Sequence, residues 1–314
     1  MGIEAKRKKG WRKLAVDVWN ARLLYLLLIP GLIQMFFFKL APLFGLSIAF
    51  QDFSTFRGIL GSDWVGLKHF MAFLQDPYTW KLVKNTLLLA LMVLFFAFPV
   101  PVIFALFLNE VRQKLIRKFV QSLSFFPYFI SSAVLVSIMY TVLSPQGGIV
   151  NQFLGRLGAE PVFFMAEPGW FRPLYTGLHI WQTFGYYAIV YLAAMTAIDP
   201  TIYEVAEIDG ANRWQKMFYI TIPSVSTTIV TMFIVSVGAI FTVDLDKILL
   251  MYNPSVYETA DVIQSFVYRT AFASQGFPNY SYGAAVSLVQ SVIAFGLVVL
   301  TNWLSKKYAE TRLF

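Results

Sequence analysis

Six long apolar stretches constrain this chain more than any other feature, because each is long enough to cross a lipid bilayer. A membrane-spanning helix needs about 20 apolar residues, and Lys39 is the only formally charged residue in all six stretches. Strands of a membrane barrel would be about 10 residues long and would alternate in polarity, which these stretches do not. We therefore predict an all-α membrane protein with six transmembrane helices, at 23–50, 87–108, 120–143, 173–198, 224–243 and 282–304.

The composition agrees with a multi-pass protein that lies in a lipid bilayer. Of the 314 residues, 58% are hydrophobic and 13% are charged, whereas soluble domains carry roughly 25% charged residues. The chain has no cysteine, which excludes disulfide scaffolds, thiolate metal sites and cysteine nucleophiles. The net charge of +8 does not indicate nucleic acid as a partner, because the basic residues lie mostly beside the apolar stretches.

The basic residues also predict how the chain is oriented. Segments 1–22, 109–119, 199–223 and 305–314 hold 16 Lys and Arg in 68 residues, whereas 51–86, 144–172 and 244–281 hold 8 in 103. Loops rich in Lys and Arg stay in the cytoplasm, so both termini are expected there. The sequence thus divides into a basic cytoplasmic N-terminus (1–22), a transmembrane domain (23–304) and a cytoplasmic C-terminal tail (305–314).

The connection 199–223, between the fourth and fifth stretches, is longer and more patterned than a turn requires. Asp199 is a good N-cap, Pro200 suits the first helical position and Gly210 suits a C-terminal stop, so a helix is predicted at 200–209. The segment has a net charge of −2, whereas a helix lying passively on a membrane is normally rich in Lys and Arg. This pattern favours a surface that docks onto another protein.

The same segment resembles the EAA loop of permease subunits of binding-protein-dependent ABC importers, with the pattern E-A-A, three residues, G, nine residues, I-x-L-P. Here Glu-Val-Ala stands at 204–206, Gly210 at the glycine and Ile-Thr-Ile-Pro at 220–223. Val205 and Ile222 depart from the pattern but keep it apolar. The segments WVGLKHF, DPYTWKLVKNTL, SFFPYFISSAVLVSIMY and GGIVNQFL are similar to the carbohydrate-transporting branch, so the resemblance covers nearly the whole chain.

The resemblance implies a type I importer permease in a bacterial cytoplasmic (inner) membrane. Its expected partners are a second, non-identical permease subunit, two ATP-binding subunits and an extracytoplasmic solute-binding protein, although a homodimer of permeases stays open. The 200–211 helix would couple to the ATPase, with Glu204 as the polar contact. The residues that the resemblance assigns to coupling are Ile202, Glu204, Val205, Ala206, Glu207, Asp209, Gly210, Ala211 and Pro223.

The residues themselves supply little for chemistry in this chain. No Lys is followed by Ser or Thr, so the phosphate-binding loop Gly-x-x-x-x-Gly-Lys-[Ser/Thr] is absent. ATP and Mg are therefore expected on the partner ATPase, and no cofactor is expected here. The two histidines, His69 and His179, have no cysteine and no evident carboxylate beside them, so the sequence predicts neither catalytic residues, nor a metal site, nor an enzyme.

The substrate is predicted less sharply than the mechanism. Sugar sites combine aromatic faces with hydrogen-bonding groups, and a few residues in or just after the last three stretches fit, although ordinary helix packing or an aromatic belt is slightly favoured for any single one of them. The resemblance suggests an oligosaccharide that contains uronic acids. A permease for another solute and an ion-coupled secondary transporter remain alternatives, but ion coupling needs ionisable residues inside the membrane. The candidate substrate-path residues are Trp181, Gln182, Tyr186, Tyr187, Asp244, Asp246 and Gln290.

Overall fold

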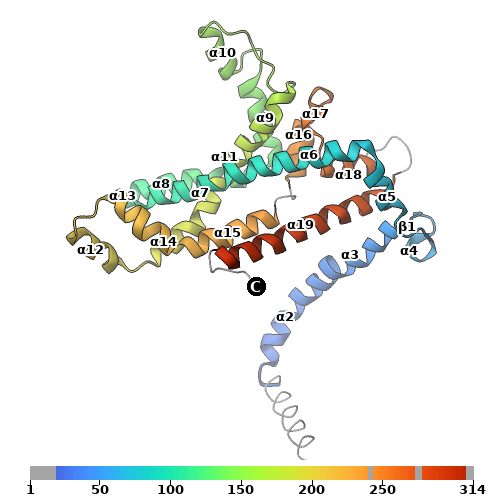
Figure 1. Cartoon of the computed structure of the whole chain (residues 1–314), viewed down its shortest axis with the longest axis horizontal. Coiled ribbons are helices and arrows are strands. Elements are labelled where there is room, and N and C mark those ends of the chain that lie inside the picture. Colours follow the sequence, from blue (N-terminus) through green and yellow to red (C-terminus); the bar gives the residue numbers. More distant parts are fainter. Residues whose placement is uncertain (1–18, 240–242, 273–277, 309–314) are drawn as a thin grey trace, which may run out of the picture.

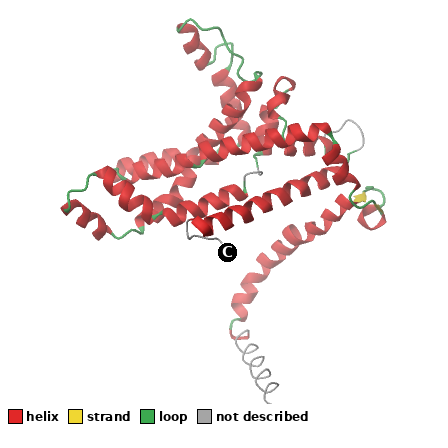
Figure 2. Ribbon diagram, viewed as in Figure 1, coloured by secondary structure: helices red, strands yellow, loops and turns green. Residues whose placement is uncertain are grey.

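The computed structural model describes residues 19–239, 243–272 and 278–308, and these are almost entirely helical (Figures 1 and 2). Within these ranges, three helical segments are long and apolar enough to cross a membrane, and three bent pairs raise the number to as many as six. The predicted N-terminal segment 1–22 and tail 305–314 fall largely outside the described residues. The all-α prediction is confirmed, and six is the upper limit of the span number rather than a settled count.

Five of the six candidate spans consist of several helical pieces. The first is α2 (Arg22–Met35), η1 (Phe36–Leu40), α3 (Ala41–Phe44) and η2 (Gly45–Phe50); the second is α6 (Pro77–Met92), η3 (Val93–Ala97) and α7 (Pro99–Asn109). The third is α8 (Lys114–Phe125), η4 (Phe126–Phe129) and α9 (Ser132–Leu143); the fourth is α11 (Pro168–Thr196), followed by α12 (Pro200–Ile208). The fifth is α13 (Arg213–Lys216), η5 (Met217–Thr221), α14 (Ile222–Ser224) and α15 (Ser226–Gly238), and the sixth is α19 (Tyr280–Tyr308).

Prolines explain where several of these pieces meet. The π-helical turns η1, η3 and η5 each end two residues before a proline, namely Pro42, Pro99 and Pro223. A proline inside a helix lacks an N–H and its ring presses on the carbonyl four residues earlier, and a wider π turn relieves both problems. The sequence predicts kinks at Pro30, Pro42, Pro99, Pro101 and Pro127. Irregular turns accompany Pro42, Pro99 and Pro127, whereas Pro30 and Pro101 lie within the α-helices α2 and α7.

The third apolar stretch, predicted at 120–143 as one span, lies in two helical segments with a sharp bend between them. Pro127 lies in the 3₁₀ turn η4, Ile130 and Ser131 are extended, and the two helical parts meet at 102°. The Ser131 side chain accepts a hydrogen bond from the Val134 N–H, so it caps a new helix rather than continuing the old one. α9 and α10 (Ile149–Arg156) consequently project from the bundle (Figure 1).

Helix α11 is the centre of the bundle and packs against α6, α7, α8 and α15. One hydrophobic cluster surrounds Tyr175 near its first half, and a second surrounds Tyr191 near its last half. Gly185 allows α8 to approach closely, since a Cβ at this position would lie 2.0 Å from the Ser124 carbonyl oxygen. In contrast, α2 has no buried residue and extends away from the bundle (Figure 1).

The end of the bundle opposite α12 carries the short elements. The hairpin of β1 (Gln51–Asp52) and β2 (Asp63–Trp64) pairs Gln51 with Trp64, and α4 (Gly58–Gly61) and α5 (Lys68–Gln75) lie beside it. A hydrogen bond from the Lys68 ammonium, 2.7 Å from Asp52 Oδ2, lowers the pKa of Asp52. The remaining helical pieces are α16 (Leu245–Met251), η6 (Pro254–Val256), α17 (Tyr257–Ala260) and α18 (Ile263–Ala271).

A buried carboxylate ties these short pieces to the second candidate span. Asp261 is fully buried and accepts hydrogen bonds from the hydroxyls of Tyr78, Tyr252 and Ser265. Its Oδ2 also lies 2.6 Å from an amino group of Arg269. Because every one of these donors faces a single buried anion, Asp261 joins α6 to α18 and to the segment before α17.

Candidate functional site

The predicted docking helix is present and is closed at both ends by its own residues. Asp199 accepts a hydrogen bond from the Thr201 N–H at 2.9 Å, and α12 begins at Pro200. At the other end Gly210 has φ = +76°, a left-handed conformation that side chains disfavour. The Gly210 N–H donates to the Glu207 carbonyl and the Ala211 N–H donates to the Ala206 carbonyl, at 3.1 and 2.8 Å. This is a Schellman motif, so Ala206, Gly210 and Ala211 form one structural unit.

An ion pair and a capping box fix the second helix of the loop against the first. Lys216 Nζ lies 2.5 Å from Glu207 Oε1, and this hydrogen bond lowers the pKa of Glu207. Asn212 and Gln215 exchange hydrogen bonds between side chain and backbone at the start of α13. The Tyr203 hydroxyl lies 2.8 Å from the Thr221 hydroxyl. The Glu207 carboxylate is therefore already paired with Lys216 within the loop.

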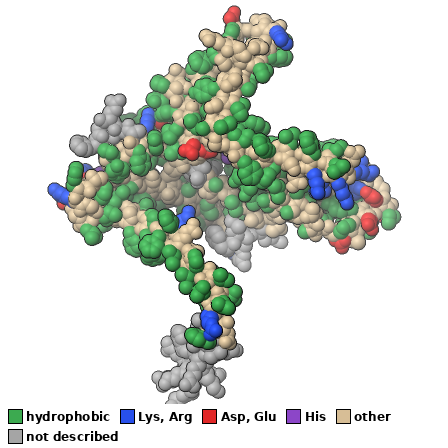
Figure 3. Space-filling model, turned by 180° about the vertical axis from the view of Figure 1, so that it is seen from behind, with side chains coloured by type: hydrophobic (Ala, Val, Ile, Leu, Met, Phe, Trp, Pro, Cys, Tyr) green, Lys and Arg blue, Asp and Glu red, His purple; other side chains and the backbone are tan. Residues whose placement is uncertain are grey.

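The outward face of α12 offers both apolar and acidic groups. Ile202, Val205 and Ile208 are 46%, 57% and 86% exposed, and α12 contains no buried residue. Glu204 is exposed and has no ion pair within the described part of the chain. Figure 3 shows charged side chains gathered at this end of the bundle, on the right, with hydrophobic side chains over much of the remaining surface. We call the exposed face of α12 the coupling surface.

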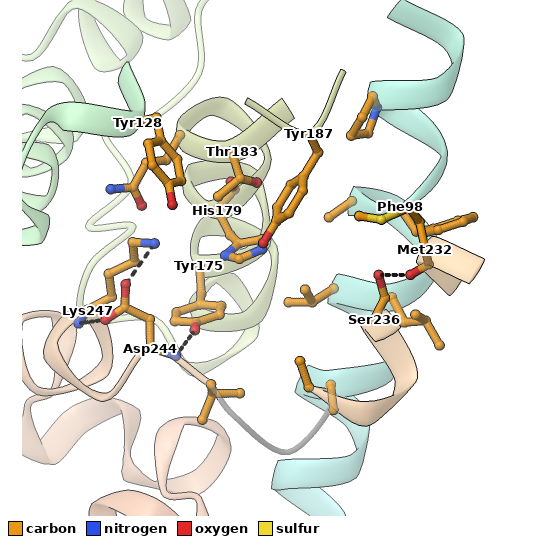
Figure 4. A pocket seen from close by; sticks show the side chains of 18 of the residues that line it. Phe98, Tyr128, Tyr175, His179, Thr183, Tyr187, Met232, Ser236, Asp244 and Lys247 are labelled. Atoms are coloured by element: carbon orange, nitrogen blue, oxygen red, sulfur yellow. Dashed lines mark hydrogen bonds and ion pairs between the residues drawn. The ribbon is translucent and has the colours of Figure 1, made fainter. Parts of the chain in front are cut away.

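A cavity of about 570 Å³ lies in the interior of the bundle (Figure 4). Its walls come from α6, η3, α7, η4, α11, α15 and α16, so residues more than 150 positions apart in the sequence meet there. One wall is apolar and includes Val93, Phe98 and Met232. The polar lining includes Tyr128, His179, Gln182, Thr183, Tyr187 and Ser236, together with the ion pair described next.

A buried ion pair forms one corner of the cavity. Lys247 is 1% exposed, and its Nζ lies 3.0 Å from Asp244 Oδ2. Ser132 Oγ donates to the same oxygen at 3.3 Å, while the Lys247 backbone N–H donates to Asp244 Oδ1 at 3.2 Å. The Asp244 N–H donates to the Tyr175 hydroxyl oxygen at 2.8 Å. Asp244 therefore contacts three residues from three helices: its carboxylate binds Lys247 and Ser132, and its backbone N–H binds Tyr175.

Aromatic rings stack beside the cavity. Tyr128, on η4, lies parallel to Tyr186 with ring centroids 3.9 Å apart, and Phe125 stacks on the same pair. Tyr187 contributes a ring to the cavity wall from the next position of α11. Flat aromatic faces next to hydrogen-bonding groups suit a ligand that has both apolar faces and polar edges, such as a sugar.

The structure groups some of the predicted path residues and separates others. Gln182, Tyr187 and Asp244 line the cavity, and Tyr186 stacks on the cavity residue Tyr128. Gln182 also donates to the Ile130 carbonyl at 3.1 Å, where the third span is broken. The cavity lining does not include three of the predicted residues, Trp181, Asp246 and Gln290.

Sequence reasoning missed Lys247 altogether and did not include His179 among the candidate path residues. The available signal for Lys247 was its position three residues after Asp244 in a chain with few charges, since this spacing places both side chains on one helix face. The available signal for Tyr128 was its place next to Pro127, where the helix breaks.

Comparisons with known proteins fit this arrangement. Residues 97–310 match the family model described as "Binding-protein-dependent transport system inner membrane component". The chain belongs to this family. It is a membrane permease component of a transport system, and it is not an enzyme. The matched region includes α12 and most of the cavity wall.

Two curated relatives of the permease come from Bacillus subtilis (strain 168). One is named polygalacturonan/rhamnogalacturonan transport system permease protein YteP and is 40% identical over 308 residues, which covers 98% of this chain and 95% of the relative. The other, named protein LplB, is 37% identical, over 95% of this chain and 92% of the relative.

The permease is also similar in fold to a protein of known structure. A crystal structure of a bacterial alginate ABC transporter in complex with alginate pentasaccharide-bound periplasmic protein contains a chain that matches the permease with a TM-score of 0.86 and 36% identity. The match covers 96% of the permease and 100% of that chain. The permease therefore has the type I ABC permease fold.

Proposed function

We propose that the permease forms half of the translocation path for an acidic oligosaccharide, imported by an ABC transporter. The relative YteP is named for polygalacturonan and rhamnogalacturonan, and the matching solved structure for alginate. Galacturonate polymers and alginate share one chemical feature, sugar rings that carry carboxylates. A uronate oligosaccharide is accordingly the proposed substrate class.

The continuity of α11 with the coupling surface is the observation that carries this proposal. Helix α11 lines the cavity through His179, Gln182 and Tyr187, and only three residues separate its end at Thr196 from the start of α12. The two helices meet at 71°. A displacement of α12 by an ATPase would therefore act directly on the cavity wall, as import coupled to ATP hydrolysis requires.

The partners follow from the family and from the exposed surfaces of the chain. We propose a second, non-identical permease subunit as the other half of the path, two ATP-binding subunits that hold ATP and Mg, and an extracytoplasmic solute-binding protein. The coupling surface is acidic and apolar, so its partner cleft should offer basic and apolar groups.

The same proposal includes the topology in the membrane. The chain would cross a bacterial cytoplasmic membrane six times, with each bent pair serving as one span. Residues 23–304 would form the transmembrane domain, with both termini and the 199–223 loop in the cytoplasm. The excess of Lys and Arg on that side supports this arrangement.

Uptake into proteoliposomes tests the proposal. Vesicles that contain the permease, its second permease subunit and the ATPase should take up labelled trigalacturonate only with both ATP and the binding protein. Maltotriose, a neutral trisaccharide, serves as the matched solute. Uptake driven by a proton gradient without the ATPase would instead identify an ion-coupled transporter, and uptake of maltotriose alone would reject the acidic substrate.

A further inference from the structure

Lys247 is a buried cation on the wall of the cavity. Asp244 is the only acidic residue that the described part of the chain brings within 4.0 Å of its Nζ. The attraction between two buried charges often does not repay the loss of their hydration, so stability alone is a weak reason for such a pair. Ionisable residues in membrane-embedded regions usually mark the path of a substrate or ion. This pair is the only one that lines the cavity, among the described residues.

The geometry leaves the lysine able to bind a second anion. The carboxylate of Asp244 is held by Ser132 Oγ and by the Lys247 backbone N–H, independently of the ammonium group. An ammonium group has three donors, and Asp244 receives one of them. Figure 4 shows the side chains of Lys247 and Asp244 next to each other, across the cavity from Phe98 and Met232.

A second group on the same cavity lacks a partner. His179 Nδ1 is buried and has no hydrogen-bond partner among the described residues, although its ring lines the cavity. When Nδ1 carries the ring proton, it can donate to an oxygen in the cavity. The described lining of the cavity thus contains one ammonium group and one ring nitrogen that lacks a hydrogen-bond partner. Asp244 is the only acidic residue in this lining.

We propose that Lys247 and His179 recognise a carboxylate of the passing oligosaccharide, and that Asp244 keeps this binding weak enough for release. The inference rests on the proposed acidic substrate and adds the residues that select it. One uronate carboxylate binds the Lys247 ammonium beside Asp244 and accepts a hydrogen bond from His179, while the sugar ring lies against Tyr128. Since Asp244 repels the same carboxylate, the affinity stays moderate, as a transport path requires.

Equilibrium binding to the purified complex of the permease, its second permease subunit and the ATPase, without binding protein, tests this assignment. The probes are digalacturonate and its dimethyl ester, which differ mainly in charge. The parental complex should bind the acid about tenfold more tightly than the ester, a difference of about 1.4 kcal/mol. Lys247→Met should bring this ratio to about one, and Lys247→Arg should retain most of it. Asp244→Asn should act in the opposite direction and raise affinity for the acid about tenfold without changing that for the ester.

Lys39→Met is the matched control, because Lys39 is exposed on η1 and away from the cavity, so this variant should keep the parental ratio. The proposal is overturned if Lys247→Met weakens both probes equally, if Asp244→Asn weakens the acid, or if the parental complex shows no preference or no saturable binding of digalacturonate. None of these results touches the proposed function, which stands or falls with ATP-dependent uptake of trigalacturonate by the parental transporter.

Discussion

Gly210 offers a direct test of the coupling surface, because the effect of an added side chain can be separated there from the effect of backbone strain. A Cβ at this position would meet nothing within 4 Å, so its addition causes no clash within the chain. The obstacle is the backbone conformation, with φ = +76°. Asn adopts this conformation more readily than other residues with a side chain, whereas a β-branched residue is strained there. Gly210→Asn and Gly210→Val therefore differ mainly in backbone strain.

The strain is comparable with what holds the turn together. Left-handed backbone costs a side-chain-bearing residue about 1–3 kcal/mol, with valine near the upper end. The Schellman motif contains two hydrogen bonds, each with a net contribution of about 0.5–1.5 kcal/mol. Since α12 has no buried residue to hold it in place, valine should open this turn and displace the coupling surface.

Substrate-stimulated ATP hydrolysis by the reconstituted transporter measures the effect. Gly210→Val should abolish most of the stimulation and reduce co-purification of the ATPase, while Gly210→Asn should keep both. Gly155→Val is the control, because Gly155 also has open space around it but lies in α10 at ordinary φ. All variants should insert normally, since the spans are untouched. Parental stimulation in the valine variant would refute the role of the turn.

Three further predictions concern the coupling contact, the topology and the buried carboxylate of Asp261. Glu204→Lys should weaken co-purification of the ATPase, whereas Glu160→Lys, in the α10–α11 connection, should not; equal effects would argue against a docking role for Glu204. A single cysteine at exposed Thr201 should be shielded from an impermeant reagent in intact cells while one at exposed Leu60 reacts, and the reverse pattern would invert the topology. Asp261→Asn removes the negative charge beside a partly buried arginine and replaces one of two acceptor oxygens with a donor. This change should destabilise the protein by about 3–5 kcal/mol, seen as a lower melting temperature of the complex in detergent; an unchanged melting temperature would show that the buried carboxylate contributes nothing.

The sequence predicted α12 closely because local residues decide its ends. Asp199, Pro200 and Gly210 act on their own neighbours, and the observed helix Pro200–Ile208 ends within one residue of the prediction. The second span was predicted from 87, yet its helix begins at Pro77, capped by Asp76. Lys81 and Lys84 interrupt the apolar pattern there, so hydropathy detects where a helix is apolar and not where it begins.

The cavity was predictable only in part, because tertiary packing assembles it. Gln182 and Tyr187 share one helix and were found by composition. Lys247 lines the cavity because the chain returns at α16 to pack beside α11. Tyr128 lines it because the third span is broken at Ile130. No local pattern contains these contacts, so a sequence without relatives to compare could not supply them.

Uptake of labelled trigalacturonate by vesicles that contain the complete transporter tests the central claim most directly. The measurement compares the parental permease with Gly210→Val, in the presence of ATP and binding protein. The account predicts ATP-dependent accumulation by the parental protein and little above background for the variant, with equal amounts of both chains in the membrane. Accumulation without ATP, or equal accumulation by both proteins, would contradict it.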